Sequence, residues 1–257
     1  MRIPLYVVDA FSRQPFCGNP AAVCLLNTTM AEKTYQSVAA EMNLSETAFV
    51  QTLSERDTLS TASRFSLRWF TPTQEIPLCG HATLATAAVL YSETANPNVH
   101  LTFETLSGEL YARKKGENIV LDFPLNPPVP QVRLFVWHFN LTASDAGRNL
   151  ERLSVDTASL LAADTGARVR GVIVTLRGDG RPYNFYSRYF APWVGINEDP
   201  VTGSAHTVLA PYWSSRLGMT HLQGDSANVL CRSELAGTGS FPHFKRWILN
   251  IPGHLAL

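Results

Sequence analysis

A pattern that occurs twice in this chain constrains its fold more than any other feature. Residues 68–72 read Arg-Trp-Phe-Thr-Pro, and residues 75–82 read Glu-Ile-Pro-Leu-Cys-Gly-His-Ala. Residues 188–192 read Arg-Tyr-Phe-Ala-Pro, and residues 198–205 read Glu-Asp-Pro-Val-Thr-Gly-Ser-Ala, after a longer loop. Copies this far apart indicate two related halves rather than a solenoid, whose repeating units are much shorter.

Each copy has the layout of a strand, a loop and a glycine turn that opens a helix. Residues 63–70 alternate in polarity, which is typical of a strand. Residues 81–91 are apolar nearly all round, which predicts a helix buried on all sides. Two such halves facing each other would direct two helix N-termini into one cleft, where an anion can bind.

A proline-rich stretch predicts the boundary between the halves. Residues 123–131 contain four prolines within eight residues, which favours a stiff, extended linker. We therefore predict a first domain at residues 1–125 and a second at residues 126–257. The segments 131–148 and 221–257 show no clear periodicity and are atypical.

Two further helices are expected from local signals. Thr29 and Glu32 have capping-box spacing before a helix at about residues 30–42. A second buried helix is predicted at residues 204–216, with a kink or break at Pro211. Further strands are expected at residues 45–51, 100–105, 109–113, 119–123, 169–176 and 183–190.

Composition excludes several classes of partner. The formal net charge is zero and 45% of residues are apolar, which argues against nucleic acid or an anionic membrane surface as partner. A first strand near the N-terminus is too short for a signal peptide, and no long apolar run predicts a transmembrane helix. The four irregularly spaced cysteines favour a reduced protein, so we predict a cytoplasmic location.

The two glycine turns are the candidate substrate-binding elements. Backbone amides around Gly80-His81 and Gly203-Ser204 could hold a substrate carboxylate, because the first amides of a helix lack intrahelical partners. The alternative is that each glycine only makes a tight turn. The matching flanks of the two copies favour a binding site.

Glu46 is the candidate general acid or base. It stands at the start of an otherwise apolar strand, where partial desolvation would raise the pKa of a carboxylate towards the proton-transfer range. The alternative is an exposed acid at a strand edge, and the residues alone favour that alternative.

Three more polar residues lie at the helix entrances. Asp199 could be a second acid/base group, or it could serve turn or capping chemistry before Pro200. His81 lies in the first turn of its helix, where a lowered pKa would keep it neutral and able to polarise a substrate. A structural histidine is the alternative, and His206 is the weaker candidate of the two histidines.

Cys79 precedes a helix N-terminus, where a thiolate would be stabilised. The repeat places Thr202 at the matching position, which excludes a symmetric two-cysteine mechanism and favours Cys79 as a packing residue. The sequence has no metal-ligand spacing, no dinucleotide fingerprint and no P-loop, so no metal and no cofactor are predicted.

These stretches resemble the PhzF-like family, named for an isomerase of phenazine biosynthesis, and above all its animal branch. The resemblance covers about residues 3–125 and again about 149–220. The matching stretches are residues 8–11, 16–23, 43–49, 70–72, 77–83 and 199–205.

The resemblance implies an α+β fold of the diaminopimelate epimerase type. Two pseudo-symmetric domains each wrap a barrel-like, mostly antiparallel sheet around a central helix, with the active site between them. It also implies a homodimer and a cofactor-independent isomerase. In the phenazine enzyme, the glutamate matching Glu46 moves a proton within a dihydro-hydroxyanthranilate, the residues matching His81 and Asp199 assist, and the glycine turns hold the carboxylate.

The chain departs from this family in the two atypical segments, so we expect an incomplete second domain of reduced stability. The leading interpretation is an isomerase acting on a small carboxylate with Glu46, His81 and Asp199. The alternative is a catalytically impaired or non-enzymatic member of the fold that binds a protein partner. A cysteine-dependent racemase, with cysteines at the positions of Cys79 and Thr202, is disfavoured by the threonine.

Overall fold

The computed structural model describes residues 2–12, 18–123, 125–129, 150–167, 169–178 and 183–226, and the backbone of residues 234–235, 239–240, 244–250 and 254–256. The atypical segment 131–148 lies outside these residues, as do the side chains of the other atypical segment beyond residue 226. The chain forms two compact units, Met1–Phe123 with Thr238–Leu257, and Pro124–Gly237. The C-terminal strands thus belong to the first unit, whereas the linker prediction assigned residues 126–257 to the second.

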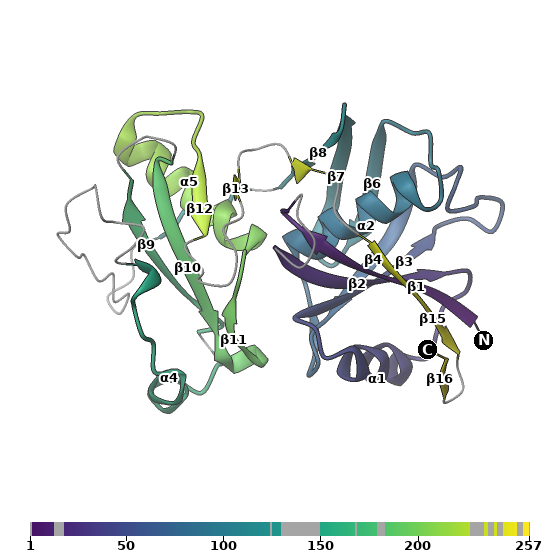
Figure 1. Cartoon of the computed structure of the whole chain (residues 1–257), viewed down its shortest axis with the longest axis horizontal. Helices are drawn as coiled ribbons and strands as arrows, with labels where there is room; N and C mark the ends of the chain where they lie inside the picture. The colour runs from purple at the N-terminus through teal and green to yellow at the C-terminus, as the bar shows by residue number, and fades with distance from the viewer. Residues whose placement is uncertain are drawn as a thin grey trace. The chain divides into compact units, whose positions relative to one another are not determined.

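The first unit is built on one large mixed sheet (Figure 1). Its strands follow the order β14-β8-β7-β6-β4-β3-β2-β1-β15-β16, and β5 pairs with β4. The pairs β2–β3 and β4–β6 are parallel and the others are antiparallel. The strands are β1 (Arg2–Ala10), β2 (Asn19–Leu26), β3 (Glu46–Thr52), β4 (Arg64–Phe70), β5 (Glu75–Ile76), β6 (His100–Thr105), β7 (Gly108–Lys115), β8 (Asn118–Asp122), β14 (Gly239–Ser240), β15 (Phe244–Asn250) and β16 (His254–Ala256).

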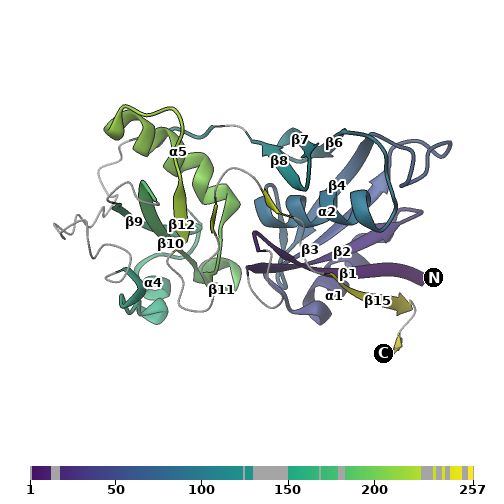
Figure 2. The ribbon, with the colours of Figure 1, turned by 45° about the horizontal axis from the view of Figure 1, so that its top comes forward.

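Alternation along the strands gives this sheet two apolar faces. In β2, Val23 packs in one core cluster with helix α2 (Gly80–Ser92), and its neighbour Cys24 packs in another with α1 (Glu32–Met42). Figures 1 and 2 show the two helices on opposite faces of the sheet. Every residue of α2 from Gly80 to Tyr91 is buried, which confirms the prediction of a fully enclosed helix.

The start of α1 differs from the prediction. Its N-cap is Ala31, and no side chain caps the helix, so the expected capping box does not form. Glu32 instead accepts two hydrogen bonds from Arg68 of β4. A charged partner is a stronger ligand for this carboxylate than a backbone amide at the helix start.

The second unit has a smaller sheet in the order β11-β10-β12-β13, with β9 paired to β10. Helix α5 covers part of it through Ala205, Leu209 and Trp213, which pack with Phe185 of β10. Its elements are α4 (Thr157–Ala163), β9 (Val172–Arg177), β10 (Phe185–Ala191), the 3-10 helix η2 (Pro192–Val194), β11 (Ile196–Asp199), α5 (Gly203–Leu217), β12 (Gly224–Ser226) and β13 (Glu234–Leu235).

Helix α5 runs from Gly203 to Leu217, which agrees with the predicted span, and it does not break at Pro211. The expectation of a buried helix is corrected, because only Ala205, Thr207, Leu209 and Trp213 are buried. The proline leaves the carbonyl of Thr207 without its helical donor. The backbone amide of Asn126 donates to that carbonyl at 3.0 Å, and the Asn126 side chain donates to Thr207 Oγ1 at 2.9 Å.

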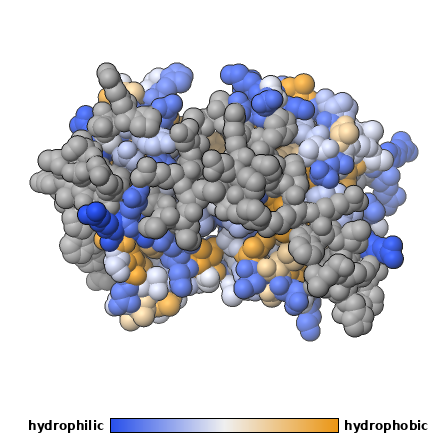
Figure 3. Space-filling view, viewed as in Figure 1, coloured by the Kyte–Doolittle hydropathy of each residue, from blue (hydrophilic) through white to orange (hydrophobic). Residues whose placement is uncertain are grey.

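One face of the molecule is seen in space-filling form in Figure 3. Figure 3 shows hydrophilic side chains over much of the described part of one face, with smaller apolar areas between them. Among the helices of the described residues, none combines the length and the apolar character needed to cross a membrane.

Candidate active site

Glu46 lies inside the sheet of the first unit and not at its edge. As the first residue of β3 it pairs in register with Ala21 of β2, and the next residue, Thr47, pairs with Phe70 of β4. Only 7% of Glu46 is exposed. The strand-edge alternative for this residue is therefore wrong, since strands flank β3 on both sides.

The entrance of α2 supplies two more polar groups beside Glu46. Cys79 is the N-cap residue in an extended conformation, and Gly80 and His81 are the first residues of the helix. Both Cys79 and His81 are buried. The apolar character of the following turns draws the helix into the core and takes its first turn with it.

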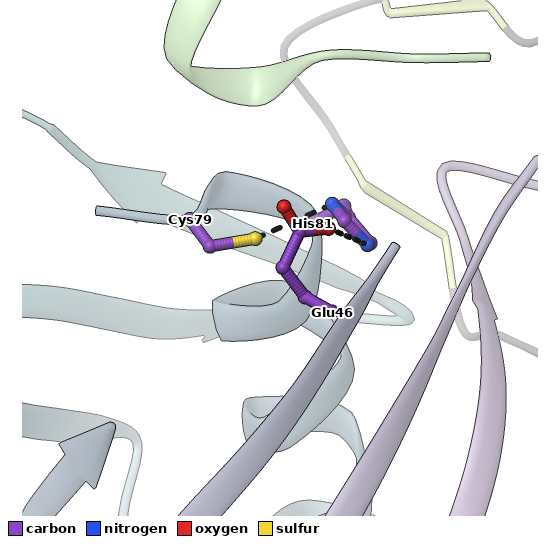
Figure 4. A group of neighbouring side chains, drawn as sticks. All are labelled: Glu46, Cys79 and His81. Carbon is purple, nitrogen blue, oxygen red and sulfur yellow. Dashed lines mark hydrogen bonds and ion pairs between the residues drawn. The ribbon is translucent and has the colours of Figure 1, made fainter. Parts of the chain in front are cut away.

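The three side chains form a connected group (Figure 4). His81 Nε2 lies 3.3 Å from Glu46 Oε2, and His81 Nδ1 lies 3.4 Å from Cys79 Sγ. One potential ligand atom from each residue lies within 4.8 Å of the others. One ring nitrogen of His81 thus lies near the carboxylate and the other near the thiol.

Burial keeps His81 neutral. Desolvation lowers the pKa of His81 to about 3, against a smaller opposing effect of the Pro20 backbone. The sequence predicted this direction from the helix N-terminus, but removal from water is the main cause. A carboxylate faces Nε2, which favours the tautomer with the proton on Nε2 and a lone pair on Nδ1.

Two residues that sequence reasoning missed support this imidazole. Ser45 Oγ lies 3.3 Å from His81 Nε2 and also donates to Asn19 Oδ1 at 3.3 Å. Both residues belong to the stretches that carry the family resemblance. Ser45 directly precedes Glu46, which was the available signal.

The second unit arranges different groups at the matching turn. Thr202 is the N-cap residue of α5, as Cys79 is of α2, and both have extended backbones without a side-chain cap. Asp199, the last residue of β11, is buried and accepts a hydrogen bond of 2.6 Å from Thr202 Oγ1. Gly203 and Ser204 are the first two residues of α5. The Asp199 contact fits the turn-chemistry alternative and leaves its acid/base role a prediction.

His206 is held by its own helix. Its Nδ1 donates to the Thr202 carbonyl at 2.7 Å, which leaves Nε2 as an acceptor. His206 is only partly exposed, and its removal from water lowers its pKa, so this imidazole is also neutral.

The arginine and the glutamate of the repeated pattern form the same ion pair in each unit, which we call the arginine–glutamate brace. Arg68 forms a two-pronged ion pair with Glu75, at 2.7 and 2.8 Å. Arg188 does the same with Glu198, at 2.7 and 2.7 Å. Each pair ties the strand to the segment that leads into the glycine turn, and this role was not assigned from the sequence.

Each unit therefore presents a helix N-terminus with a glycine at its first position. The first amides of such a helix are free to bind a carboxylate. That both turns line one cleft concerns the arrangement of the two units and stays a prediction.

Comparison with known proteins decides the family. The sequence model of the phenazine biosynthesis-like proteins (PhzC-PhzF) matches residues 8–144 and 136–233. The chain belongs to this family. Phenazine biosynthesis-like domain-containing protein 1 of Mus musculus is 49% identical over 248 residues, which cover 84% of this chain and 85% of the mouse protein. A Pseudomonas aeruginosa protein described as an uncharacterized isomerase is 42% identical over 89% of this chain and 88% of its own length.

Solved structures show the same fold. A PhzF family protein of Enterococcus faecalis has a TM-score of 0.77 at 34% identity, covering 98% of this chain and all of its own. A hydroxyproline epimerase of Agrobacterium vitis has a TM-score of 0.59 at 12% identity, covering 98% of this chain and 94% of its own. The expected α+β epimerase-like fold, of the diaminopimelate epimerase type, is confirmed.

Proposed function

We propose that this PhzF-like protein is a cofactor-independent isomerase that moves a proton between two positions of a small carboxylate-bearing substrate. Membership of the family and the related protein described as an isomerase support the reaction class. The buried group of Glu46, His81 and Cys79 supports a proton-transfer mechanism. In this group the Glu46 carboxylate can accept a proton, and the neutral His81 imidazole lies next to it.

Glu46 is the proposed proton carrier. Its carboxylate takes a proton from a substrate carbon and returns it at another atom, so no electrons are gained or lost and no cofactor is required. Because His81 is neutral, its Nε2–H group, 3.3 Å from Glu46 Oε2, can orient that carboxylate without neutralising it. The observation that carries this proposal is the 3.3 Å contact between Glu46 Oε2 and His81 Nε2 inside the sheet.

The second unit is proposed to complete the site. Asp199 would polarise or protonate the substrate, and the amides at Gly80-His81 and Gly203-Ser204 would bind its carboxylate. A homodimer and a cytoplasmic location remain parts of the same proposal. The molar mass in solution, measured by sedimentation, tests the dimer.

Hydrogen exchange at carbon tests the reaction. The protein is incubated in deuterated water with a panel of small cyclic and amino carboxylates, and deuterium at carbon is measured by NMR. We expect Glu46→Gln to lower the exchange rate at least ~100-fold, the usual contribution of a general acid or base. Glu41→Gln, an exposed acid at the end of α1, is the matched control and should exchange like the unmodified protein.

Two outcomes would overturn the proposal. Exchange that survives Glu46→Gln would exclude this residue as the proton carrier. Absence of exchange with every carboxylate of the panel would favour the alternative, a non-enzymatic member of the fold that binds a protein partner.

A further inference from the structure

Tertiary structure assembles a set of metal-ligand types that the sequence spacing does not reveal. Glu46 comes from the start of β3, whereas Cys79 and His81 come from the entrance of α2. A carboxylate, a thiol and an imidazole thereby lie within 4.8 Å of one another. Such a trio is the donor set of a site for a transition-metal cation.

We propose that Glu46, Cys79 and His81 bind a thiophilic divalent cation of the Zn²⁺ type, and that this cation inhibits proton transfer at the site. The binding part stands on the geometry of the three side chains. The inhibition part rests on the proposed function of Glu46.

The imidazole is prepared to act as a ligand. A coordinating imidazole needs one ring nitrogen turned towards the cation and the other held by a partner. His81 Nε2 lies 3.3 Å from Ser45 Oγ, which can accept a hydrogen bond from the ring and fix its orientation when Glu46 turns to the cation. The lone pair of Nδ1 then points towards Cys79, 3.4 Å away. Ser45 thus has the place of an outer partner that orients a metal-binding histidine.

The distances between donors are close to those of a tetrahedral site. Metal bonds of ~2.0–2.3 Å place neighbouring donors about 3.3–3.8 Å apart. The separation of Cys79 Sγ and His81 Nδ1 is already 3.4 Å. Rotation of the Glu46 carboxylate can bring one oxygen towards the same point, because all three donors start within 4.8 Å. Three protein ligands leave a fourth position for water.

The donor types select the cation. A thiolate with an imidazole suits Zn²⁺ or Co²⁺, whereas Mg²⁺ and Ca²⁺ require several oxygen ligands. On binding, Cys79 forms a metal–sulfur bond and its thiol proton passes to solvent. Glu46 would then hold the cation and could not accept a proton from a substrate.

The second unit offers a natural comparison. Thr202 occupies the N-cap position that corresponds to Cys79, and a hydroxyl is no substitute for a thiolate ligand. The two halves should therefore differ in metal binding, and we expect a single site of this type, in the first unit.

Titration of the full-length protein with Co²⁺ under reducing conditions tests the binding. We expect one equivalent to bind with a sulfur-to-cobalt charge-transfer band in the near ultraviolet, and Zn²⁺ to displace it. Cys79→Ser should abolish the band. His81→Asn should weaken metal binding at least ~10-fold, because even residues that only orient a metal ligand lower the affinity by that factor when they are replaced. Circular dichroism checks that each variant folds. If Cys79→Ser does not fold, Cys79→Thr takes its place, since threonine is the residue at the corresponding position 202 of the second unit.

Cys24→Ala is the matched control. Cys24 is buried in the core, and desolvation raises the pKa of its thiol, so it should not supply a thiolate. The band should remain in this variant. Absence of the band from the unmodified protein, or its persistence without Cys79, would overturn the site.

The inhibition is measured separately. Zn²⁺ at saturating concentration should lower carbon exchange at least ~10-fold in the unmodified protein, because it occupies the proposed base. A cobalt spectrum with undiminished exchange would overturn the inhibition and leave the metal site. Absence of exchange at every metal concentration would instead count against the proposed function.

Discussion

The two halves of the molecule share one sequence pattern but bury it to different extents. Both have a strand, an arginine–glutamate brace and a glycine-opened helix. Helix α2 of the first unit is buried from Gly80 to Tyr91, whereas α5 buries only four of its residues. The repeat thus specifies the local turn, and the surrounding sheet decides how deeply the turn is enclosed.

The chemistry at the turns differs in parallel with this burial. In the first unit a carboxylate and a thiol lie near the two ring nitrogens of a neutral imidazole. In the second unit Asp199 contacts the hydroxyl of Thr202, and His206 contacts a backbone carbonyl. One repeated turn can therefore carry different polar groups, as the proposed function requires for proton transfer in one half and substrate polarisation in the other.

The largest expected difference between the halves is the loss of unfolding free energy when a buried leucine of α2 or α5 is shortened to alanine. Leu84 and Leu209 are each 2% exposed. Leu84→Ala should lower the free energy of unfolding by about 4 kcal/mol, and Leu209→Ala by about 2–3 kcal/mol, because a cavity beside an enclosed helix relaxes less. Urea unfolding followed by hydrogen exchange of peptides from each unit measures both values. Equal costs would contradict the difference in enclosure.

The second largest expected difference concerns the two arginine–glutamate ion pairs, which should contribute unequally to the free energy of unfolding. The side chain of Arg188 is 7% exposed and that of Arg68 is 26% exposed. Arg188 also donates to the carbonyls of Leu150 and Leu153. Arg188→Met should therefore cost about 3 kcal/mol, since it leaves buried acceptors unpaired. Arg68→Met should cost about 1 kcal/mol, because its pairs are partly solvated.

The same urea experiment separates the two braces. Conversion of Glu104 to Gln on the exposed surface, where it pairs with Arg64, is a control that should cost at most ~0.5 kcal/mol. A loss at Arg68 as large as that at Arg188 would show that exposure does not govern the brace.

The buried imidazole predicts a pH dependence of the first unit. The pKa of His81 is about 3 in the folded chain and 6.5 when unperturbed. Between these values the unfolded chain binds more protons, so stability falls as pH drops through the window. From neutral pH to about pH 5, this residue should account for about 2 kcal/mol of lost stability.

His81→Asn should remove that loss while Glu46 and Cys79 stay in place. His100→Asn, an exposed histidine at the start of β6, is the control and should keep the profile of the unmodified protein. Unfolding free energies at several pH values measure the effect. An unchanged slope in His81→Asn would mean that the ring is not buried neutral.

The smallest predicted effect concerns the proline of α5. The Asn126 side chain donates to Thr207 Oγ1 beside the carbonyl that Pro211 cannot engage. Asn126→Ala should cost about 1 kcal/mol, the usual value of one hydrogen bond. Faster hydrogen exchange should appear in α5 and not in α2. An unaltered α5 would show that the backbone bond of Asn126 suffices.

The sequence by itself determined the local elements. The duplicated pattern predicted both glycine-opened helices and their strands, because alternation and turn residues act over a few positions. The enclosed helix at residues 81–91 followed from its lack of charged side chains and its apolar character nearly all round. The family stretches named Glu46, His81 and Asp199, and the fold of the family is confirmed.

Tertiary structure alone decided which of these residues meet. Nothing in the spacing of Ser45, Glu46, Cys79 and His81 shows that the start of β3 lies beside the entrance of α2. The sequence left open whether Pro211 kinks or breaks its helix and whether Glu46 is desolvated or exposed at a strand edge, since each outcome depends on partners distant in the chain. Contacts of this kind are set by packing of the sheet and its helices, which local propensity does not encode.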